Sequence, residues 1–136
     1  MEKIKESLAE LEKFTDIISV AASYEKDIFL KDPIIYGAAE RFILLGLKCM
    51  LDVCGDIVQK YGFSGNTNCE NLIVLLQKHK VYPEWLANRL AVKTKLITSP
   101  DRDYLKEMNK SDLYDLLDEV ILDFRYFKKF VLEYIV

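Results

Sequence analysis

Glycine, proline and histidine are scarce in this chain of 136 residues, which contains five glycines, three prolines and a single histidine. An all-β protein needs many tight turns, and tight turns depend on glycine and proline, so this composition argues against one. Leucine, lysine and glutamate are common instead, and all three favour helices. The sequence therefore predicts an all-α protein. Its length and its 51% of hydrophobic residues suit one compact domain over residues 1–136.

Long uncharged runs and paired cysteines are also missing. The longest apolar stretch is broken by Arg41, Lys48 and Asp52, so we expect no membrane contact. The three cysteines form no C-x-x-C pair, and no signal peptide is visible, which predicts reduced thiols in a cytoplasmic protein. A net charge of −3 argues against general affinity for nucleic acid, although a local patch or a dimer groove could still hold RNA.

The chain is organised around one long predicted helix, which begins at Asp32 and Pro33 and runs to Tyr61. Aspartate is a good N-cap, and proline suits the first helical position. Apolar residues cover more than one face of this helix, so it needs helical neighbours on at least two sides. Its excess of apolar surface also makes a homodimer plausible. The predicted buried stripe consists of Ala38, Phe42, Leu45, Cys49, Val53 and Ile57. It is widened to more than one face by Ile35, Ile43, Leu47, Met50, Leu51, Cys54 and Val58.

Further helices are predicted on both sides of this element. Residues 2–29 form an amphipathic first helix that ends in a short turn. A third helix covers 70–78, capped by Thr67 or Asn68, and a fourth covers 83–96. Residues 97–109 form an irregular segment, and Asn109 caps a final helix that runs to the C-terminus. The result is an antiparallel bundle of four to five helices.

Sequence signatures of common enzymes are absent. The chain has no phosphate-binding G-x-x-x-x-G-K-[ST] loop, no G-x-S-x-G nucleophile and no zinc spacing, so we expect no metal and no cofactor. His79 lies between two lysines at a predicted helix end and is interpreted as a surface residue. Glu40, Arg41 and Asp52 interrupt the apolar run of the central helix. They are either partly exposed or paired within the bundle, or they belong to a site or a dimer interface.

The order of these elements resembles the HepT-like branch of the HEPN superfamily. The resemblance covers nearly the whole chain: the long first helix, the AAERFILLGLKCMLDVCGDIV stretch, the NCENLIVLLQKHKVYPEWLANRL segment and an aromatic final helix. Proteins of this branch are small all-α dimers, paired with a minimal nucleotidyltransferase in prokaryotic toxin–antitoxin modules. The resemblance implies a homodimer, a nucleotidyltransferase antitoxin as partner and RNA as a substrate.

The family's motif lies before the last helix and reads Arg, four to six residues, His, one residue, Tyr. In the family, the arginine and histidine of two protomers face one cleft and cleave RNA without a metal. Aligned on Tyr104, the histidine position holds Arg102 and the arginine position falls near Ile97 or Thr98. Arginine stays protonated near neutral pH and cannot act as a general base. We therefore expect the ribonuclease activity to be weakened or lost.

The resemblance still implies a function for two residues, Tyr104 and Arg102. Tyr104 corresponds to the family tyrosine that the partner modifies with AMP, and Arg102 beside it offers bidentate donors for a phosphate. Two alternatives stay open. One is an active ribonuclease with a rearranged set of Arg102, Tyr104 and Lys106. The other is a helical interaction module without nucleotide chemistry.

Overall fold

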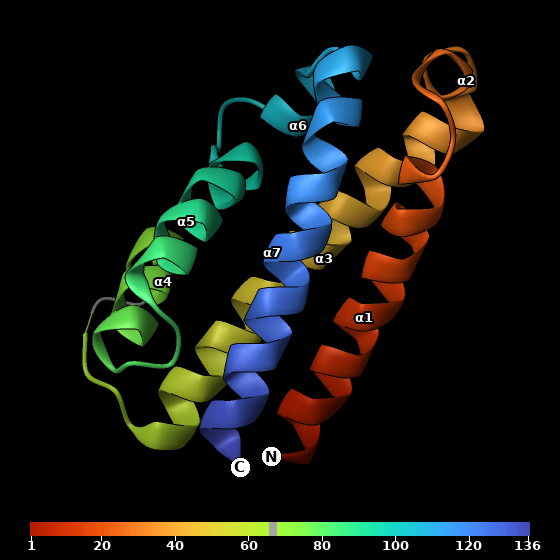
Figure 1. The fold of residues 1–136 in the computed structure, drawn as a ribbon. Coiled ribbons are helices and arrows are strands. Elements are labelled where there is room, and N and C mark those ends of the chain that lie inside the picture. Colours follow the sequence, from red (N-terminus) through yellow and green to blue (C-terminus); the bar gives the residue numbers. More distant parts are fainter. Residues whose placement is uncertain (66–67) are drawn as a thin grey trace.

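The computed structural model describes residues 1–65 and 68–136, and within them it contains seven α-helices and no strand. This confirms the all-α prediction, with two short helices beyond the four to five expected (Figure 1). The helices are α1 (Glu2–Ala22), α2 (Lys26–Lys31), α3 (Pro33–Tyr61), α4 (Cys69–Lys78), α5 (Glu84–Thr98), α6 (Tyr104–Glu107) and α7 (Lys110–Ile135).

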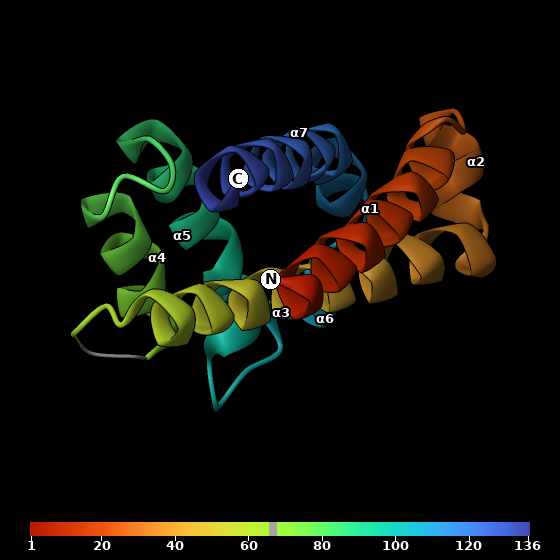
Figure 2. The same ribbon diagram turned by 90° about the horizontal axis from the view of Figure 1, so that it is seen from below.

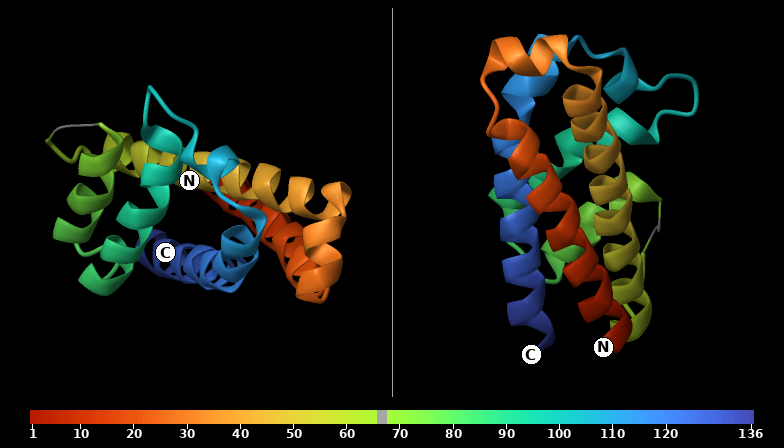
Figure 3. Two further views of the ribbon diagram at one scale, coloured as in Figure 1. Left: turned by 90° about the horizontal axis from the view of Figure 1, so that it is seen from above. Right: turned by 90° about the vertical axis from the view of Figure 1, so that its right-hand side faces the viewer.

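The three long helices form the body of the molecule. Helix α1 packs against both α3 and α7, and all three lie side by side (Figure 3). Helices α4 and α5 cover the other flank of α3 and α7, and both chain ends lie at the same end of the bundle (Figures 1 and 2). One contiguous apolar core joins these elements, and its largest fully buried side chains include Phe29, Phe124 and Phe127. No helix among the described residues is long and apolar enough to cross a membrane.

The helix starts predicted from capping residues are confirmed. The side chain of Asp32 accepts a hydrogen bond from the Ile34 amide at 3.0 Å, with Pro33 in the first position of α3. Asn109 caps α7 in the same way, since its Oδ1 accepts from the Asp112 amide at 2.8 Å. Asn68 caps α4; the alternative cap, Thr67, lies outside the described residues. These side chains satisfy amide groups that the first turn of a helix leaves without an intrahelical partner.

The prediction of one continuous first helix over 2–29 is wrong. Helix α1 ends at Ala22, and a separate α2 begins at Lys26. Within the bend, the carbonyl of Tyr24 accepts a hydrogen bond from the Tyr114 hydroxyl at 2.7 Å. Phe29 is then fully buried, with its ring 5.0 Å from that of Tyr114. A straight helix would not make these contacts with α7, so burial of an aromatic ring decides the break.

The buried face of α3 lies within the wide apolar surface predicted for this helix. Val53 and Ile57 of the narrow predicted stripe are buried, whereas Ala38, Phe42, Leu45 and Cys49 are only half-buried. Most of the residues predicted to widen the stripe are buried as well: Ile43, Leu47, Met50, Cys54 and Val58. Helix α7 approaches this face closely, because a Cβ atom at Gly46 would overlap the ring of Phe124. The fully buried positions of α3 are Ala39, Ile43, Leu47, Met50, Val53, Cys54 and Ile57.

Candidate functional site

The candidate site lies in the segment between α5 and α7. Figure 3 shows that the chain leaves α5 in a loop that stands out from the bundle and then returns through α6. Leu105, which is buried, anchors this return in the core. The Asp103 side chain caps α6 by accepting from the Lys106 amide at 3.0 Å. Part of the segment predicted to be irregular is therefore helical. Arg102 lies just before this short helix, and Tyr104 is its first residue.

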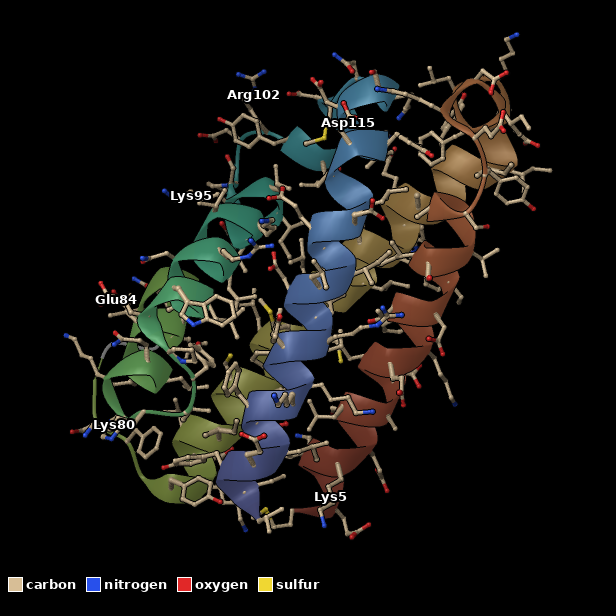
Figure 4. The ribbon with its side chains drawn as sticks, in the orientation of Figure 1. Lys5, Lys80, Glu84, Lys95, Arg102 and Asp115 are labelled. Atoms are coloured by element: carbon tan, nitrogen blue, oxygen red, sulfur yellow. The ribbon has the colours of Figure 1, made fainter. Side chains whose placement is uncertain are left out.

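Arg102 and Tyr104 are in contact. The guanidinium carbon of Arg102 lies 5.0 Å from the centre of the Tyr104 ring, within the range of a cation–π interaction. Its Nη2 and Nε atoms both donate to Oε2 of Glu107, at 2.9 and 3.2 Å. Tyr104 is 41% exposed as a residue, and Figure 4 shows Arg102 at the periphery of the molecule. The phenol is therefore open to a partner while a cation lies over its ring.

The hydrogen bond from Glu107 raises the pKa of the Arg102 guanidinium, and the charge of the same carboxylate adds to this effect. Arg102 is therefore permanently cationic at physiological pH. It can bind a phosphate group through two parallel hydrogen bonds, but it cannot remove a proton.

A hollow of about 360 Å³ adjoins this segment. Leu44 and Lys48 from α3 form one wall, and the residues from Ser99 to Asp103 contribute to the other, Arg102 among them. Two cations, Lys48 and Arg102, therefore border one cavity, with two aspartates beside them. Lys48 was not among the predicted site residues. Like Glu40, Arg41 and Asp52, it is a charged residue within an otherwise apolar helix. Its position beside the loop is visible only in the folded structure.

The three charges singled out on α3 have different environments. Oε2 of Glu40 lies 2.9 Å from Nζ of Lys110, which ties α3 to the first turn of α7. The same ammonium group lies 5.1 Å from the centre of the Tyr36 ring. Arg41 and Asp52 are exposed to solvent. The structure pairs only Glu40 within the bundle and does not join the three into one cluster with Arg102.

A second charged cluster, buried between α5 and α7, was missed by the sequence reasoning. Asp123 is only 1% exposed, and its carboxylate accepts a hydrogen bond from Nε of Arg89. Nζ of Lys93 lies 3.0 Å from the other carboxylate oxygen and 3.8 Å from Glu119. The pKa of Arg89 is raised, chiefly by its hydrogen bond to Asp123. The available signal was an aspartate within the apolar stripe of α7, next to Phe124.

The described cysteines are poor nucleophiles. Burial raises the pKa of the Cys54 thiol to about 12 and that of the half-buried Cys49 thiol to about 11. Both are therefore protonated at neutral pH. His79 lies at the surface end of α4, as predicted, with its ring stacked on Phe63 at 3.7 Å. Among the described residues, no group of three or more histidine, cysteine or acidic side chains is placed to hold a metal ion.

No family profile matches this sequence, and no curated protein matches it. Solved structures nevertheless define the class of fold: an HEPN-type helical bundle, as in the toxins of toxin–antitoxin complexes.

Three of these structures are similar over nearly the whole chain. A chain of the mutant MntA-HpeT toxin–antitoxin complex matches with a TM-score of 0.85 and 14% identity, covering 98% of this chain and 99% of that one. The complex of the tri-AMPylated Shewanella oneidensis HEPN toxin with the MNT antitoxin gives 0.83 and 15%, covering 96% of each chain. YutE, a cytosolic protein of unknown function from Bacillus subtilis, gives 0.80 and 20%, covering 98% and 88%. At such identities the likeness concerns the fold.

Proposed function

We propose that this chain is the HEPN-type member of a cytoplasmic toxin–antitoxin pair, and that it binds a minimal nucleotidyltransferase which transfers AMP to Tyr104. The proposal is carried by one observation: a half-exposed phenol lies on a segment that stands out from the bundle, with the Arg102 guanidinium 5.0 Å from its ring. The similarity of fold to an AMPylated HEPN toxin in complex with its antitoxin supports the same reading.

The proposed reaction is a nucleotidyl transfer. The Tyr104 oxygen attacks the α-phosphorus of ATP, a new P–O bond forms to the phenol, and the bond to the leaving pyrophosphate breaks. The phenol proton passes to a base of the nucleotidyltransferase. Arg102 is close enough to Tyr104 to pair with the charge of the transferred phosphate, since a guanidinium binds phosphate oxygens in a bidentate fashion.

Metal-independent ribonuclease activity is weakened or lost in this proposal. Proton transfer near neutral pH requires a group that titrates there, as histidine does. Arg102 occupies the histidine position, and Glu107 raises its pKa further. His79 is the C-cap of α4, in stacking contact with Phe63 and outside the loop. The alternative, an active ribonuclease built on Arg102, Tyr104 and Lys106, requires two such loops to share one cleft in a homodimer.

The test is to look for a reading frame for a small nucleotidyltransferase beside this gene, to co-express its product with this chain, and to measure the intact mass of the purified chain. We expect a mass increase by one or more AMP groups that depends on the partner and on ATP, and that disappears in Tyr104→Phe. Tyr24→Phe is the matched control, because Tyr24 is equally exposed but lies on the α1–α2 bend. Modification that persists in Tyr104→Phe would refute the assignment of Tyr104. Absence of any such neighbouring gene would favour the non-catalytic helical module.

The ribonuclease alternative is tested separately, by RNA cleavage with EDTA present. We expect no cleavage by the wild type. Cleavage that Arg102→Ala abolishes would instead establish a rearranged active site.

A further inference from the structure

A groove of about 440 Å³ lies between α1 and α7. None of its lining residues also lines the hollow beside the Arg102 loop. Three of the lining side chains are buried, and pockets that hold small molecules have volumes of roughly 300–1,000 Å³. The lining consists of Leu11, Glu12, Thr15 and Asp16 from α1 and of Phe124, Arg125, Lys128, Lys129 and Leu132 from α7.

The charged residues of this groove are separated by helix. Helix α1 contributes only carboxylates, Glu12 and Asp16, and α7 contributes only cations, Arg125, Lys128 and Lys129. Residues three or four positions apart lie on one face of a helix, so each set forms a row along its own helix. The groove therefore has an acidic rim on α1 and a basic rim on α7.

One ion pair fixes the register of the two rims. Nζ of Lys128 lies 2.8 Å from Oε2 of Glu12. The two helices run antiparallel, since α1 starts and α7 finishes at the same end of the bundle (Figure 1). Asp16, four residues further along α1, is therefore level with Arg125, three residues back along α7. At 1.5 Å per residue, both lie roughly 5–6 Å along the helix axes from the ion pair.

The two charges at this level do not neutralise each other. Asp16 and Arg125 form no ion pair with one another or with any other residue that the structure describes. Arg125 nevertheless lies close enough to α1 to act on Glu12. The pKa of Glu12 is lowered chiefly by the hydrogen bond and the charge of Lys128, and the charge of Arg125 adds to this effect.

The buried hydroxyl of Thr15 adds a hydrogen-bond acceptor beside Asp16. Thr15 is only 3% exposed, and its Oγ1 donates to the carbonyl of Leu11 at 2.7 Å. A hydroxyl has a single proton to donate, so the Thr15 oxygen can take part in a further hydrogen bond only as an acceptor. On the α1 side, this level of the groove therefore suits a positively charged donor.

A zwitterion with both charges on neighbouring atoms matches this level. An ammonium group has three donors and no acceptor, which suits Asp16 and Thr15 together. A carboxylate accepts two parallel hydrogen bonds from a guanidinium, which suits Arg125. A simple anion would leave Asp16 without a counter-ion, and a simple cation would do the same to Arg125. The apolar part of the lining, available to a hydrophobic side group, consists of Leu11, Phe124 and Leu132.

We propose that the α1–α7 groove binds a free hydrophobic α-amino acid. Its ammonium group lies between Asp16 and the Thr15 hydroxyl, its carboxylate pairs with Arg125, and its side chain packs on the apolar lining. Lys129, four residues beyond Arg125 on the same rim, adds to the positive potential at the carboxylate. This site is separate from Tyr104, and it goes beyond the proposed function without depending on it.

The first experiment compares three probes that share one phenyl group: L-phenylalanine, 3-phenylpropanoate and 2-phenylethylammonium. Each is titrated into the ¹⁵N-labelled full chain and followed by amide NMR shifts. We expect L-phenylalanine to shift signals of α1 and α7, with a dissociation constant on the order of 1 mM, and to bind roughly tenfold more tightly than either analogue. No saturation with L-phenylalanine at about 20 mM, or equal affinity for all three probes, would overturn the proposal.

The second experiment repeats the titrations with charge variants of the two rims. Asp16→Asn is expected to weaken L-phenylalanine roughly fivefold and to strengthen 3-phenylpropanoate, because it removes a negative charge beside the anion. Arg125→Gln is expected to weaken both of these probes but not 2-phenylethylammonium.

The matched controls are Asp52→Asn and Arg41→Gln, which remove exposed charges on α3 and are expected to change no affinity. Unchanged binding of L-phenylalanine in Asp16→Asn and Arg125→Gln would refute this placement of the ligand, as would equal losses in the controls. Modification of Tyr104 is measured separately by intact mass, so this proposal and the proposed function can fail independently.

Discussion

The buried carboxylate of Asp123 gives the sharpest test of how α5 is held on α7. In Asp123→Ala, Lys93 keeps a side chain that is 7% exposed but loses its nearest counter-ion, while Arg89, about one-third exposed, can turn toward water. Removing one partner from a buried ion pair costs about 3–5 kcal/mol. Because Arg89 relaxes, we expect a loss of about 3 kcal/mol, which for a chain of this size lowers Tm by roughly 10 °C.

The assay is urea unfolding followed by far-UV circular dichroism, with all variants at the same protein concentration. Glu133→Ala, on the exposed side of the same helix, is the control and is expected to change stability by less than about 0.5 kcal/mol. Adding Lys93→Met to Asp123→Ala is expected to recover part of the loss, because no uncompensated buried charge remains. A loss below about 1 kcal/mol in Asp123→Ala would refute the view that this cluster fastens α5 to α7.

Two further predictions concern packing and pH. Gly46→Ala is expected to destabilise the fold by about 1–3 kcal/mol, because the new Cβ overlaps the Phe124 ring. The control is Gly55→Ala, which has open space at its Cβ and is expected to stabilise the fold by up to about 1 kcal/mol. Equal effects of the two substitutions in urea unfolding would contradict the close approach of α3 and α7. The hydrogen bond from Lys128 lowers the pKa of Glu12 below its usual value near 4.5. A carboxylate whose pKa is lowered in the folded chain stabilises the fold at pH values above its ordinary, unfolded-state pKa. This stabilisation is lost as the pH falls through the lowered, folded-state pKa. The stability difference between wild type and Lys128→Met is therefore expected to shrink below pH 4.5, and a difference that grows in acid would contradict it.

Much of the helical framework was predictable because its signals are local. Asp32, Pro33 and Asn109 mark helix starts through hydrogen bonds made within a few residues, and the structure confirms them. The end of α1 at Ala22 was not predictable in this way. It depends on Phe29 and on the carbonyl of Tyr24, whose partner Tyr114 lies 90 residues away.

Some residues of the candidate site were predicted from the sequence, and others were found only in the structure. The resemblance to the family's motif before the last helix singled out Arg102 and Tyr104, and their roles remain proposals. Glu107 as the partner of Arg102, and Lys48 across the hollow, became visible only in the folded chain. Arg89, Lys93 and Asp123 carry no local sign of their pairing, because a buried ion cluster depends on which helix faces meet.

The sequence by itself determined the helical class and most helix starts, since capping and periodicity act within one or two turns of the chain. The tertiary structure decided which face of α3 is buried, where the first helix breaks and which distant charges pair. These outcomes depend on close contacts such as that of Gly46 with Phe124, which no single helix contains.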